Sequence, residues 1–414
     1  MRILMIHQAF CCPADPGGTR HYEFARRLVA AGHQFTVVTS QHSYLTGEQK
    51  CTDSDCGRID LRIAKAVRGI HHSYFCRVLV FITFMATSVV TALRAGAIDT
   101  VLGTTPPMFQ AISAWVVAAV RGCPFILEVR DLWPDFAIDL GILRNPVLIW
   151  LARRLEAFLY ARAHQMIVNS PAYREYLLGK GIADSRIALV PNGVDVSLFH
   201  PERQGEMFRR QHQLGDKFIV MYAGALGSAN DIQCLLRAAS RLCEDARVMV
   251  VIVGDGKERT QLRREADALH LKNVRFVAAQ PKQCMPDILA AADVCVATLK
   301  DVPMFRMTYP NKVFDYMAAG RPSIIAIDGV IREVIENARA GVFVPPGNDA
   351  ALAAAIQKFR SSPELRRQMG ANARCYVEQH FDRDRQATDF AKILESTCGQ
   401  PTSRETASIS VPDL

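Results

Sequence analysis

The chain has 414 residues, of which 50% are hydrophobic and 22% are charged. This length favours two domains of roughly 200 residues each, and the composition excludes disorder over most of the chain. The formal net charge of +8 is moderate, and no run of five like charges occurs. The charge pattern therefore argues against a nucleic-acid-binding protein.

The first half of the chain repeats short apolar runs, each followed by a turn and a helical segment. The first predicted strand is at residues 3–6, and the turn at residues 16–19 precedes a helix at residues 22–31. Continuous apolar runs are typical of buried parallel strands. Further strands are predicted at residues 35–38, 100–102, 125–129, 166–168 and 187–190.

Turn-forming residues gather between Pro191 and Pro201, which predicts a linker, and the pattern then restarts. Alternating strands and helices predict a doubly wound parallel sheet in each half. We expect domains at 1–196 and 197–384, a helix at 385–398 that returns to the first domain, and a disordered tail at 399–414. Strands of the second half are predicted at residues 218–222, 248–253, 274–277, 294–297 and 323–327.

The cysteines and the N-terminus indicate a cytoplasmic protein. The 12 cysteines are scattered and lack zinc-finger spacing, so we interpret them as small apolar residues in a reducing compartment. The apolar segment at residues 2–6 is too short for a secretory signal. His7, His21 and His33 do not form a ligand set, and we expect no metal site.

Several segments in their order and spacing resemble family 4 of the retaining glycosyltransferases, especially the bacterial branch that builds cell-surface polysaccharides on a lipid carrier. The resemblance implies the GT-B fold, in which two Rossmann-like domains face each other across a cleft. It also implies metal-independent transfer from a nucleotide sugar, with a UDP-linked sugar as the candidate donor, and no cofactor. The matching segments are residues 16–20, 128–134, 190–195, 254–256 and 310–322.

The turn at Pro310 is the strongest candidate for binding the donor diphosphate. Cleavage of a sugar–phosphate bond develops negative charge, which helix N-terminal N–H groups and a lysine can stabilise. Proline favours the first helical position, and Asn311 and Lys312 follow it. We predict Lys312 as the main cationic contact; the alternative is a solvated lysine on an ordinary helix.

The resemblance maps Asp315 onto the glutamate with which the family binds ribose. Eight residues earlier the family has a second glutamate, where this chain has Met307. Other contacts to the donor hexose are then expected from residues 301–309, with Arg306 as a candidate for neutralising phosphate. An exposed arginine without a specific role is the alternative.

Three glycine-bearing loops follow predicted strands, where the lack of a Cβ atom allows close approach to a phosphate. We predict that Gly17 and Gly18 close over the diphosphate from the opposite domain, and that Gly224 occupies the matching position in the second half. The segment Gly254-Asp255-Gly256 is predicted to form a turn near the nucleotide. Plain structural turns are the alternative, and the adjacent pair is not a dinucleotide-binding fingerprint.

Arg130 and Asp131 end a predicted strand at the expected cleft. The family often has a histidine or an acid here, so we predict that Asp131 orients the acceptor hydroxyl or the donor sugar. Arg130 then pairs with Asp131 or contacts an acceptor phosphate. The alternative is a structural ion pair, and we assign Glu128 to the scaffold.

The stretch 58–94 combines basic residues with an apolar run at residues 78–93 that is too short to cross a bilayer. Because relatives act on lipid-linked sugars, we predict a polyprenyl-diphosphate-linked glycan acceptor and peripheral contact of this stretch with an anionic membrane. A core helix with solvated arginines at its ends is the alternative. The basic residues are Arg58, Arg62, Lys65, Arg68, Arg77 and Arg94.

Two other functions remain open from the sequence. A sugar-nucleotide 2-epimerase shares the GT-B fold but needs carboxylates for proton transfer, and no convincing pair occurs. Such an epimerase would convert UDP-N-acetylglucosamine without an acceptor. A non-catalytic sugar-binding homologue is conceivable because of Met307.

Overall fold

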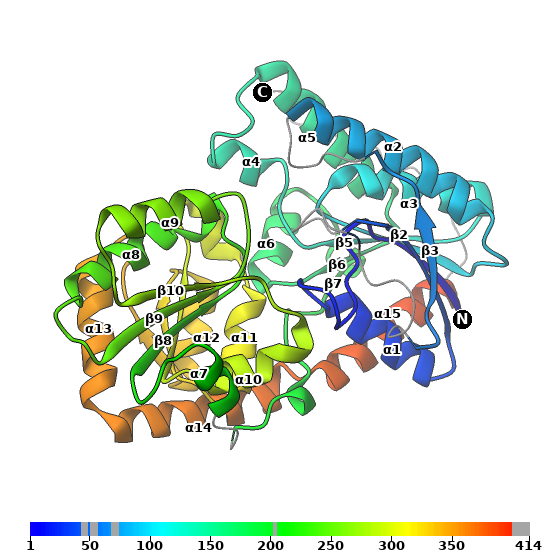
Figure 1. The fold of residues 1–414 in the computed structure, drawn as a ribbon. Coiled ribbons are helices and arrows are strands. Elements are labelled where there is room, and N and C mark those ends of the chain that lie inside the picture. Colours follow the sequence, from blue (N-terminus) through cyan, green and yellow to red (C-terminus); the bar gives the residue numbers. More distant parts are fainter. Residues whose placement is uncertain (43–48, 50–56, 68–73, 202–204, 400–414) are drawn as a thin grey trace. The chain divides into compact units, whose positions relative to one another are not determined.

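A computed structural model describes residues 1–42, 49, 57–67, 74–201 and 205–399 (Figure 1). The chain divides into two compact units. Unit 1 comprises Met1–Cys12, Thr19–Pro191 and Asp384–Leu414, and unit 2 comprises Pro13–Gly18 and Asn192–Arg383. Of the predicted tail, residues 400–414 lie outside the described residues, and Gly399 ends the last helix.

Unit 1 is built on a seven-stranded parallel sheet in the order β3-β2-β1-β4-β5-β6-β7. Its strands are β1 (Arg2–Ile6), β2 (Gln34–Ser40), β3 (Asp60–Ala64), β4 (Thr100–Thr104), β5 (Phe125–Val129), β6 (Gln165–Val168) and β7 (Ile187–Leu189). Its helices are α1 (Arg20–Ala30), α2 (Tyr74–Leu93), α3 (Met108–Arg121), α4 (Asp135–Asp139), α5 (Pro146–Arg162), α6 (Pro171–Gly179) and α15 (Arg383–Gly399).

The central strands of unit 1 are buried along their whole length, as continuous apolar runs predict. Every residue of β4 and β5 is buried. Helices α1 and α15 pack together through Phe24 and Phe390, whose rings stack at a centroid distance of 4.7 Å. The last helix thus contributes to the core of unit 1.

Unit 2 is built on a six-stranded parallel sheet in the order β10-β9-β8-β11-β12-β13. Its strands are β8 (Phe218–Ala223), β9 (Val248–Val253), β10 (Val274–Val277), β11 (Val294–Thr298), β12 (Ser323–Ala326) and β13 (Gly341–Phe343). Its helices are α7 (Glu206–Gln211), α8 (Ile232–Arg241), α9 (Arg259–Ala268), α10 (Met285–Ala290), α11 (Asn311–Ala318), α12 (Val330–Ala338), α13 (Asp349–Ser361) and α14 (Pro363–His380).

The two parallel sheets confirm the predicted α/β class, and two strands were not predicted. Strands β3 and β13 lie at sheet edges. Strand β3 alternates charged with apolar residues, and β13 has three residues. Edge strands are often short and polar, so they lack the apolar run that identifies a central strand.

One cysteine departs from the interpretation of the cysteines as free apolar residues. Cys12 is disulfide-bonded, whereas Cys123, Cys234 and Cys295 are among the free cysteines of the described chain. The spacing of cysteines in a sequence does not reveal such a pair, because connectivity depends on the fold.

Candidate active site

Lys312 lies against the C-terminal end of β8, within unit 2. Its Nζ donates to Tyr222 Oη at 2.7 Å and to Asn230 Oδ1 at 2.8 Å. Nζ also lies 4.3 Å from the centroid of the Tyr222 ring. An ammonium group has three donors, and the third has no partner among the residues described. Ligands of open α/β sheets bind beyond the C-terminal ends of the strands, so Lys312 lies where an anionic ligand is expected.

Burial lowers the pKa of Lys312 to about 7. No carboxylate contacts its Nζ in the described chain, so nothing offsets the loss of hydration of the ammonium group. An anion that replaces this hydration would favour the charged form of Lys312. The geometry and the pKa together fit a phosphate contact.

Helix α11 holds Lys312 in place. Pro310 is the N-cap of this helix, one position before the predicted one. Tyr316 fixes α11 to the sheet, because its Oη accepts from the Ala223 N–H at 3.0 Å. Gly224 leaves room for the lysine, since a Cβ atom there would lie 3.1 Å from Lys312 Cε.

The loop at Gly254-Asp255-Gly256 packs directly on the loop that follows β8. The Leu226 N–H donates to Asp255 O at 2.8 Å. A Cβ atom at Gly254 would lie 1.9 Å from Gly224 O, and one at Gly256 would lie 2.4 Å from Leu226 O. Both glycines are therefore required by the close approach of two backbones, and the loop supports the segment beside Lys312.

Asp315 is paired with a lysine that the sequence analysis did not single out. Lys282 Nζ lies 2.6 Å from both carboxylate oxygens of Asp315. The pair is largely buried, with side-chain exposures of 12% for Lys282 and 16% for Asp315. A ribose hydroxyl that approached Asp315 would meet a carboxylate already neutralised by Lys282.

The other predicted donor residues of unit 2 lie at the surface. Arg306 is paired with Asp301 at 3.2 Å, and both side chains are more than half exposed. No contact joins Arg306 to Lys312 in the part of the chain that the structure describes. Asn311 is exposed at the start of α11. Met307 ends a short 3-10 helix at Pro303–Met307.

Gly17 and Gly18 are exposed. Their segment, Pro13–Gly18, groups with unit 2 instead of the rest of the N-terminal half. One contact in this grouping is the Gln283 N–H, which donates to Pro13 O at 3.3 Å. A Cβ atom at Gly18 would meet nothing within 4 Å, so packing does not require glycine there.

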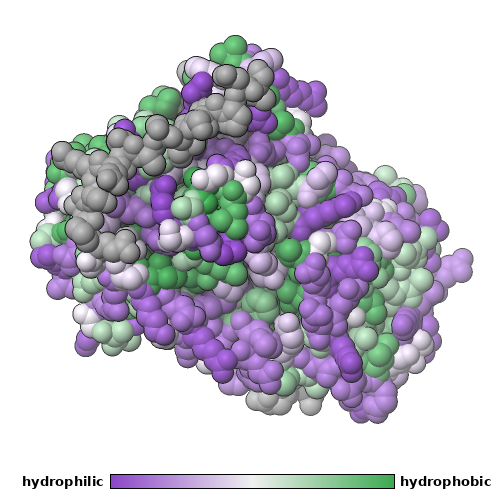
Figure 2. All heavy atoms as spheres, turned by 180° about the vertical axis from the view of Figure 1, so that it is seen from behind, coloured by the Kyte–Doolittle hydropathy of each residue, from purple (hydrophilic) through white to green (hydrophobic). Residues whose placement is uncertain are grey.

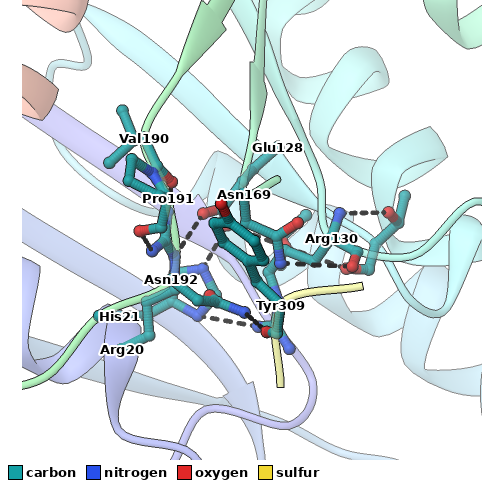
Figure 3. Close-up of polar contacts among 12 residues, drawn as sticks. Arg20, His21, Glu128, Arg130, Asn169, Val190, Pro191, Asn192 and Tyr309 are labelled. Carbon is teal, nitrogen blue, oxygen red and sulfur yellow. Dashed lines mark hydrogen bonds and ion pairs between the residues drawn. The ribbon is translucent and has the colours of Figure 1, made fainter. Parts of the chain in front are cut away.

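In unit 1, the buried carboxylate of Glu128 is the centre of a polar cluster (Figure 3). Arg20 Nε donates to Glu128 Oε1 at 2.9 Å, and Thr104 Oγ1 donates to Oε2 at 3.1 Å. Arg20 also donates to the carbonyls of Val190 and Pro191, at 2.7 Å each. The cluster joins the start of α1 and the end of β5 to the chain after β7.

His21 connects this cluster to Arg130. Its Nε2 contacts Glu128 Oε2, and its Nδ1 lies 3.3 Å from Arg130 Nη1 (Figure 3). Burial lowers the pKa of His21 to about 4, although Glu128 opposes this shift. The imidazole is therefore neutral at pH 7. Because a guanidinium only donates, Nδ1 must accept from Arg130 and Nε2 must carry the proton.

Asp131 follows Arg130 directly after β5, with a partly buried side chain. Burial raises the pKa of Asp131 to about 6, and Arg130 partly opposes this shift. Its carboxylate accepts no hydrogen bond from any residue that the structure describes. A carboxylate that is partly desolvated and unengaged can accept a hydroxyl proton or orient a sugar.

Sequence reasoning missed Lys282 and the roles of Arg20 and His21. Arg20 lay in a segment used for the family resemblance, and His21 was considered only as a metal ligand. A signal existed in Arg20, because a charged side chain at the start of a helix that packs on the core needs a buried partner. Within the described residues, no group of three His, Cys, Asp or Glu side chains could hold a metal ion.

Two family models match the chain, one in each half. The model described as Glycosyl transferase 4-like domain matches residues 17–193. The model described as Glycosyl transferases group 1 matches residues 204–375. Together they cover every strand of unit 2 and every strand of unit 1 except β1, which precedes residue 17.

Curated relatives carry related names. WcaI of Escherichia coli strain K12, named for colanic acid biosynthesis, is 23% identical over 70% of this chain and 72% of its own length. A GDP-mannose-dependent mannosyltransferase of Mycobacterium tuberculosis, named for phosphatidylinositol dimannoside, is 26% identical over 53% of this chain and 56% of its own length. The chain thus spans little more than half the length of the second relative.

Solved structures share the fold. Anabaena Alr3699/HepE, crystallised with UDP and glucose, matches with a TM-score of 0.74 and 18% identity, over 96% of this chain and all of that one. WaaG, a glycosyltransferase of lipopolysaccharide biosynthesis, matches with a TM-score of 0.69 and 16% identity, over 95% of this chain and 99% of its own.

Proposed function

We propose, from the premise that this chain belongs to the family 4 glycosyltransferases of the GT-B fold, that it transfers a hexose or an N-acetylhexosamine with retention of configuration. The donor is a nucleotide sugar, with a UDP-linked sugar as the candidate, and the acceptor is a lipid-linked glycan. The relative WcaI and the structural neighbour WaaG support a role in cell-surface polysaccharide synthesis. The enzyme would work in the cytoplasm, at the inner face of the membrane.

The observation that carries this proposal is the environment of Lys312. A partly buried lysine without a carboxylate partner in the described chain has a free N–H donor beyond the C-terminal end of β8. Such a group gains most from a ligand that brings negative charge. The diphosphate of a nucleotide sugar is such a ligand, and the HepE structures with UDP and UDP-glucose support this choice.

The reaction breaks the bond between the anomeric carbon and the donor phosphate, and it forms a bond from that carbon to the acceptor oxygen. The acceptor proton passes to an oxygen of the leaving diphosphate on the same face of the sugar. Lys312 and the N–H groups at the start of α11 would stabilise the developing charge. No metal and no enzymic nucleophile is required.

The acceptor side of the proposal uses Arg130 and Asp131. Asp131 would orient the acceptor hydroxyl or the donor sugar. Arg130 would contact the phosphate of a polyprenyl-diphosphate carrier, with its guanidinium fixed by His21. Arginine suits this task because its planar group binds phosphate oxygens in pairs.

A screen of thermal stability against nucleotide sugars tests the proposal. A ligand that binds only the native state raises the melting temperature, so the true donor should stand out from sugars on other bases. Proton NMR of the product formed from that donor then reports the anomeric configuration. An inverted product would contradict retention, and the absence of any stabilising nucleotide sugar would contradict the donor assignment.

A further inference from the structure

Lys282 and Asp315 form a largely buried pair of opposite charges in unit 2. The Lys282 Nζ atom lies 2.6 Å from each carboxylate oxygen of Asp315, and the two side chains are 12% and 16% exposed. Hydrophilic atoms, drawn in purple, cover much of the face shown in Figure 2, as expected for charged groups that keep their water. The Lys282–Asp315 pair has given up most of its water, so each charge depends on the other.

The ammonium group of Lys282 is held from two sides. Lys282 begins a short 3-10 helix at Lys282–Cys284, which follows β10, whereas Asp315 belongs to α11. Its Nζ atom also lies 5.5 Å from the ring centroid of the buried Phe199. A carboxylate and an aromatic face both stabilise an ammonium ion. Lys282 is therefore fixed on Asp315 by its surroundings.

The pair lies next to the proposed contact with the diphosphate. Asp315 follows Lys312 by three residues in α11, so the two side chains share one face of the helix. Strands β10 and β8 belong to the same parallel sheet, and both Lys282 and Lys312 lie beyond the C-terminal ends of its strands. The ribose of a nucleotide is joined directly to its diphosphate. A ribose that extends along α11 from Lys312 therefore meets the pair.

The state of the carboxylate decides how strongly a site selects ribose. A buried carboxylate that relies on the ribose hydroxyls is left unpaired when a hydroxyl is missing, and such sites reject the deoxy analogue strongly. In this chain Lys282 contacts both oxygens of Asp315 without any ligand. The loss of a ribose hydroxyl then leaves no buried charge unpaired. Displacement of Lys282 by ribose would leave the ammonium group without its carboxylate, which is strongly unfavourable.

We propose that Lys282 sets the nucleotide specificity of the donor site: because it occupies the carboxylate of Asp315, the site accepts a 2′-deoxyribonucleoside diphosphate sugar nearly as well as the ribonucleoside form. The inference rests on the proposed function and deepens it, since it names a class of donor. Sugars linked to deoxyuridine or deoxythymidine diphosphate join the UDP-linked sugars as candidate donors. Lys312 contacts the diphosphate in either class.

A pair that only braces α11 would look the same in the free protein. In that case the ribose hydroxyls would find other acceptors, and the selection for ribose would not depend on Lys282. The ratio of two affinities separates the two roles. A change in folding affects both nucleotides alike, whereas a change at the carboxylate affects only the one that carries the 2′-hydroxyl.

Calorimetric titration with UDP and with 2′-deoxy-UDP tests the proposal. The full chain is titrated without lipid, because the pair and Lys312 lie within unit 2. Among the described helices, none is long and apolar enough to span a bilayer. We expect the Kd of 2′-deoxy-UDP to exceed that of UDP by less than about fivefold, as for one neutral hydrogen bond. A larger ratio in the wild type would overturn the proposal.

Two variants test whether Lys282 is the cause. In Lys282→Met the carboxylate of Asp315 has only the ribose hydroxyls as donors, so the ratio should rise by about tenfold or more, as for a charged hydrogen bond. In Lys282→Met/Asp315→Asn no charge is left, and the ratio should return to that of the wild type. Lys272→Met, at an exposed lysine of unit 2, is the control and should keep the wild-type ratio. An unchanged ratio in Lys282→Met would show that the pair is only a brace.

The wild-type ratio keeps the proposal testable if a variant fails to fold. The melting temperature of each variant reports the loss of the pair in the folded protein. Where the screen of nucleotide sugars selects another base, the ribose and deoxyribose forms of that base replace UDP and 2′-deoxy-UDP. A wild type that binds no nucleotide would contradict the proposed function as well. A wild type that binds both forms with a ratio above about fivefold would contradict this inference alone.

Discussion

The Nδ1 atom of His21 accepts from Arg130 across 3.3 Å, while its Nε2 faces the buried carboxylate of Glu128. The Glu128 carboxylate keeps the proton of His21 on Nε2. The unprotonated Nδ1 can then accept a hydrogen bond that orients the Arg130 guanidinium. This arrangement makes His21 a positioning residue for Arg130. A double-mutant cycle on kcat with His21→Gln and Arg130→Ala tests it.

In that cycle we expect each single variant to lower kcat by about tenfold or more, and the double variant to have the same kcat as Arg130→Ala. Residues that act through one another give such non-additive effects. Fully additive losses would mean that His21 supports the fold without acting through Arg130. The melting temperature of each variant is the control for folding.

Removal of the Glu128 carboxylate should have a large effect on stability. Glu128→Ala leaves Arg20 buried without its carboxylate, which costs about 3–5 kcal/mol when the partner of a buried pair is lost. Glu128→Gln keeps the shape and should cost less. Urea unfolding measures both, and a loss below 1 kcal/mol for Glu128→Ala would contradict the buried network.

Asp131→Asn should stabilise the protein and weaken catalysis. The pKa of Asp131 is raised to about 6, so the native state binds more protons than the unfolded state between pH 4 and 6. The associated stability is lost as the pH rises through 6. At pH 7.5 the variant should gain up to about 3 kcal/mol, and at pH 3.5 it should gain nothing.

In Asp131→Asn, kcat/KM should no longer fall as the pH drops below 6, and its pH-independent value should be much lower than that of the wild type. Asp139→Asn, at an exposed aspartate of the same unit, is the matched control and should change neither stability nor rate. A variant that keeps both the wild-type rate and the fall of kcat/KM at low pH would exclude Asp131 from the reaction.

The affinity for the donor should fall as the pH rises above 7. The pKa of Lys312 is about 7 in the free protein, and a bound diphosphate favours the ammonium form. Binding then takes up a proton, so Kd should rise about fivefold between pH 7 and 8 and about ninefold between pH 8 and 9. Titrations of the wild type and of Lys312→Met across this range measure the slope, which should be absent in the variant.

Gly18→Ala separates a role in binding from a role in packing. A Cβ atom at Gly18 has open space, whereas one at Gly254 would lie 1.9 Å from Gly224 O. We expect Gly18→Ala to unfold like the wild type but to bind the donor more weakly, because the backbone can no longer approach the phosphate. Gly254→Ala should lose about 1–3 kcal/mol of stability. Unchanged binding in Gly18→Ala would remove this loop from the site.

The sequence was sufficient for the architecture because central parallel strands are continuous apolar runs. It did not show β3 and β13, whose edge positions leave them short or polar. It also identified Lys312 and Asp131 as candidate site residues, because the apolar pattern located the start of the helix that carries Lys312 and the end of the strand that precedes Asp131. It could not show that Lys282 neutralises Asp315 or that Cys12 is disulfide-bonded, since these partners are brought together by folding.

The position of Arg306 illustrates the same limit. The sequence places this arginine in a loop before α11, which suggested a phosphate contact. The structure pairs it with Asp301 at the surface. Loop side chains take their direction from tertiary contacts, so the sequence did not reveal the pairing of Arg306 with Asp301, and a contact of Arg306 with phosphate stays a prediction.

Calorimetric titration of the donor nucleotide sugar in buffer with EDTA tests the central role of Lys312 most directly, with Lys272→Met as the control at an exposed lysine of unit 2. We predict that the wild type and the control bind without metal, and that Lys312→Met loses roughly 10- to 150-fold in affinity, as for a charged hydrogen bond. Equal affinity in Lys312→Met, or binding that disappears with EDTA and returns with a divalent ion, would contradict the account.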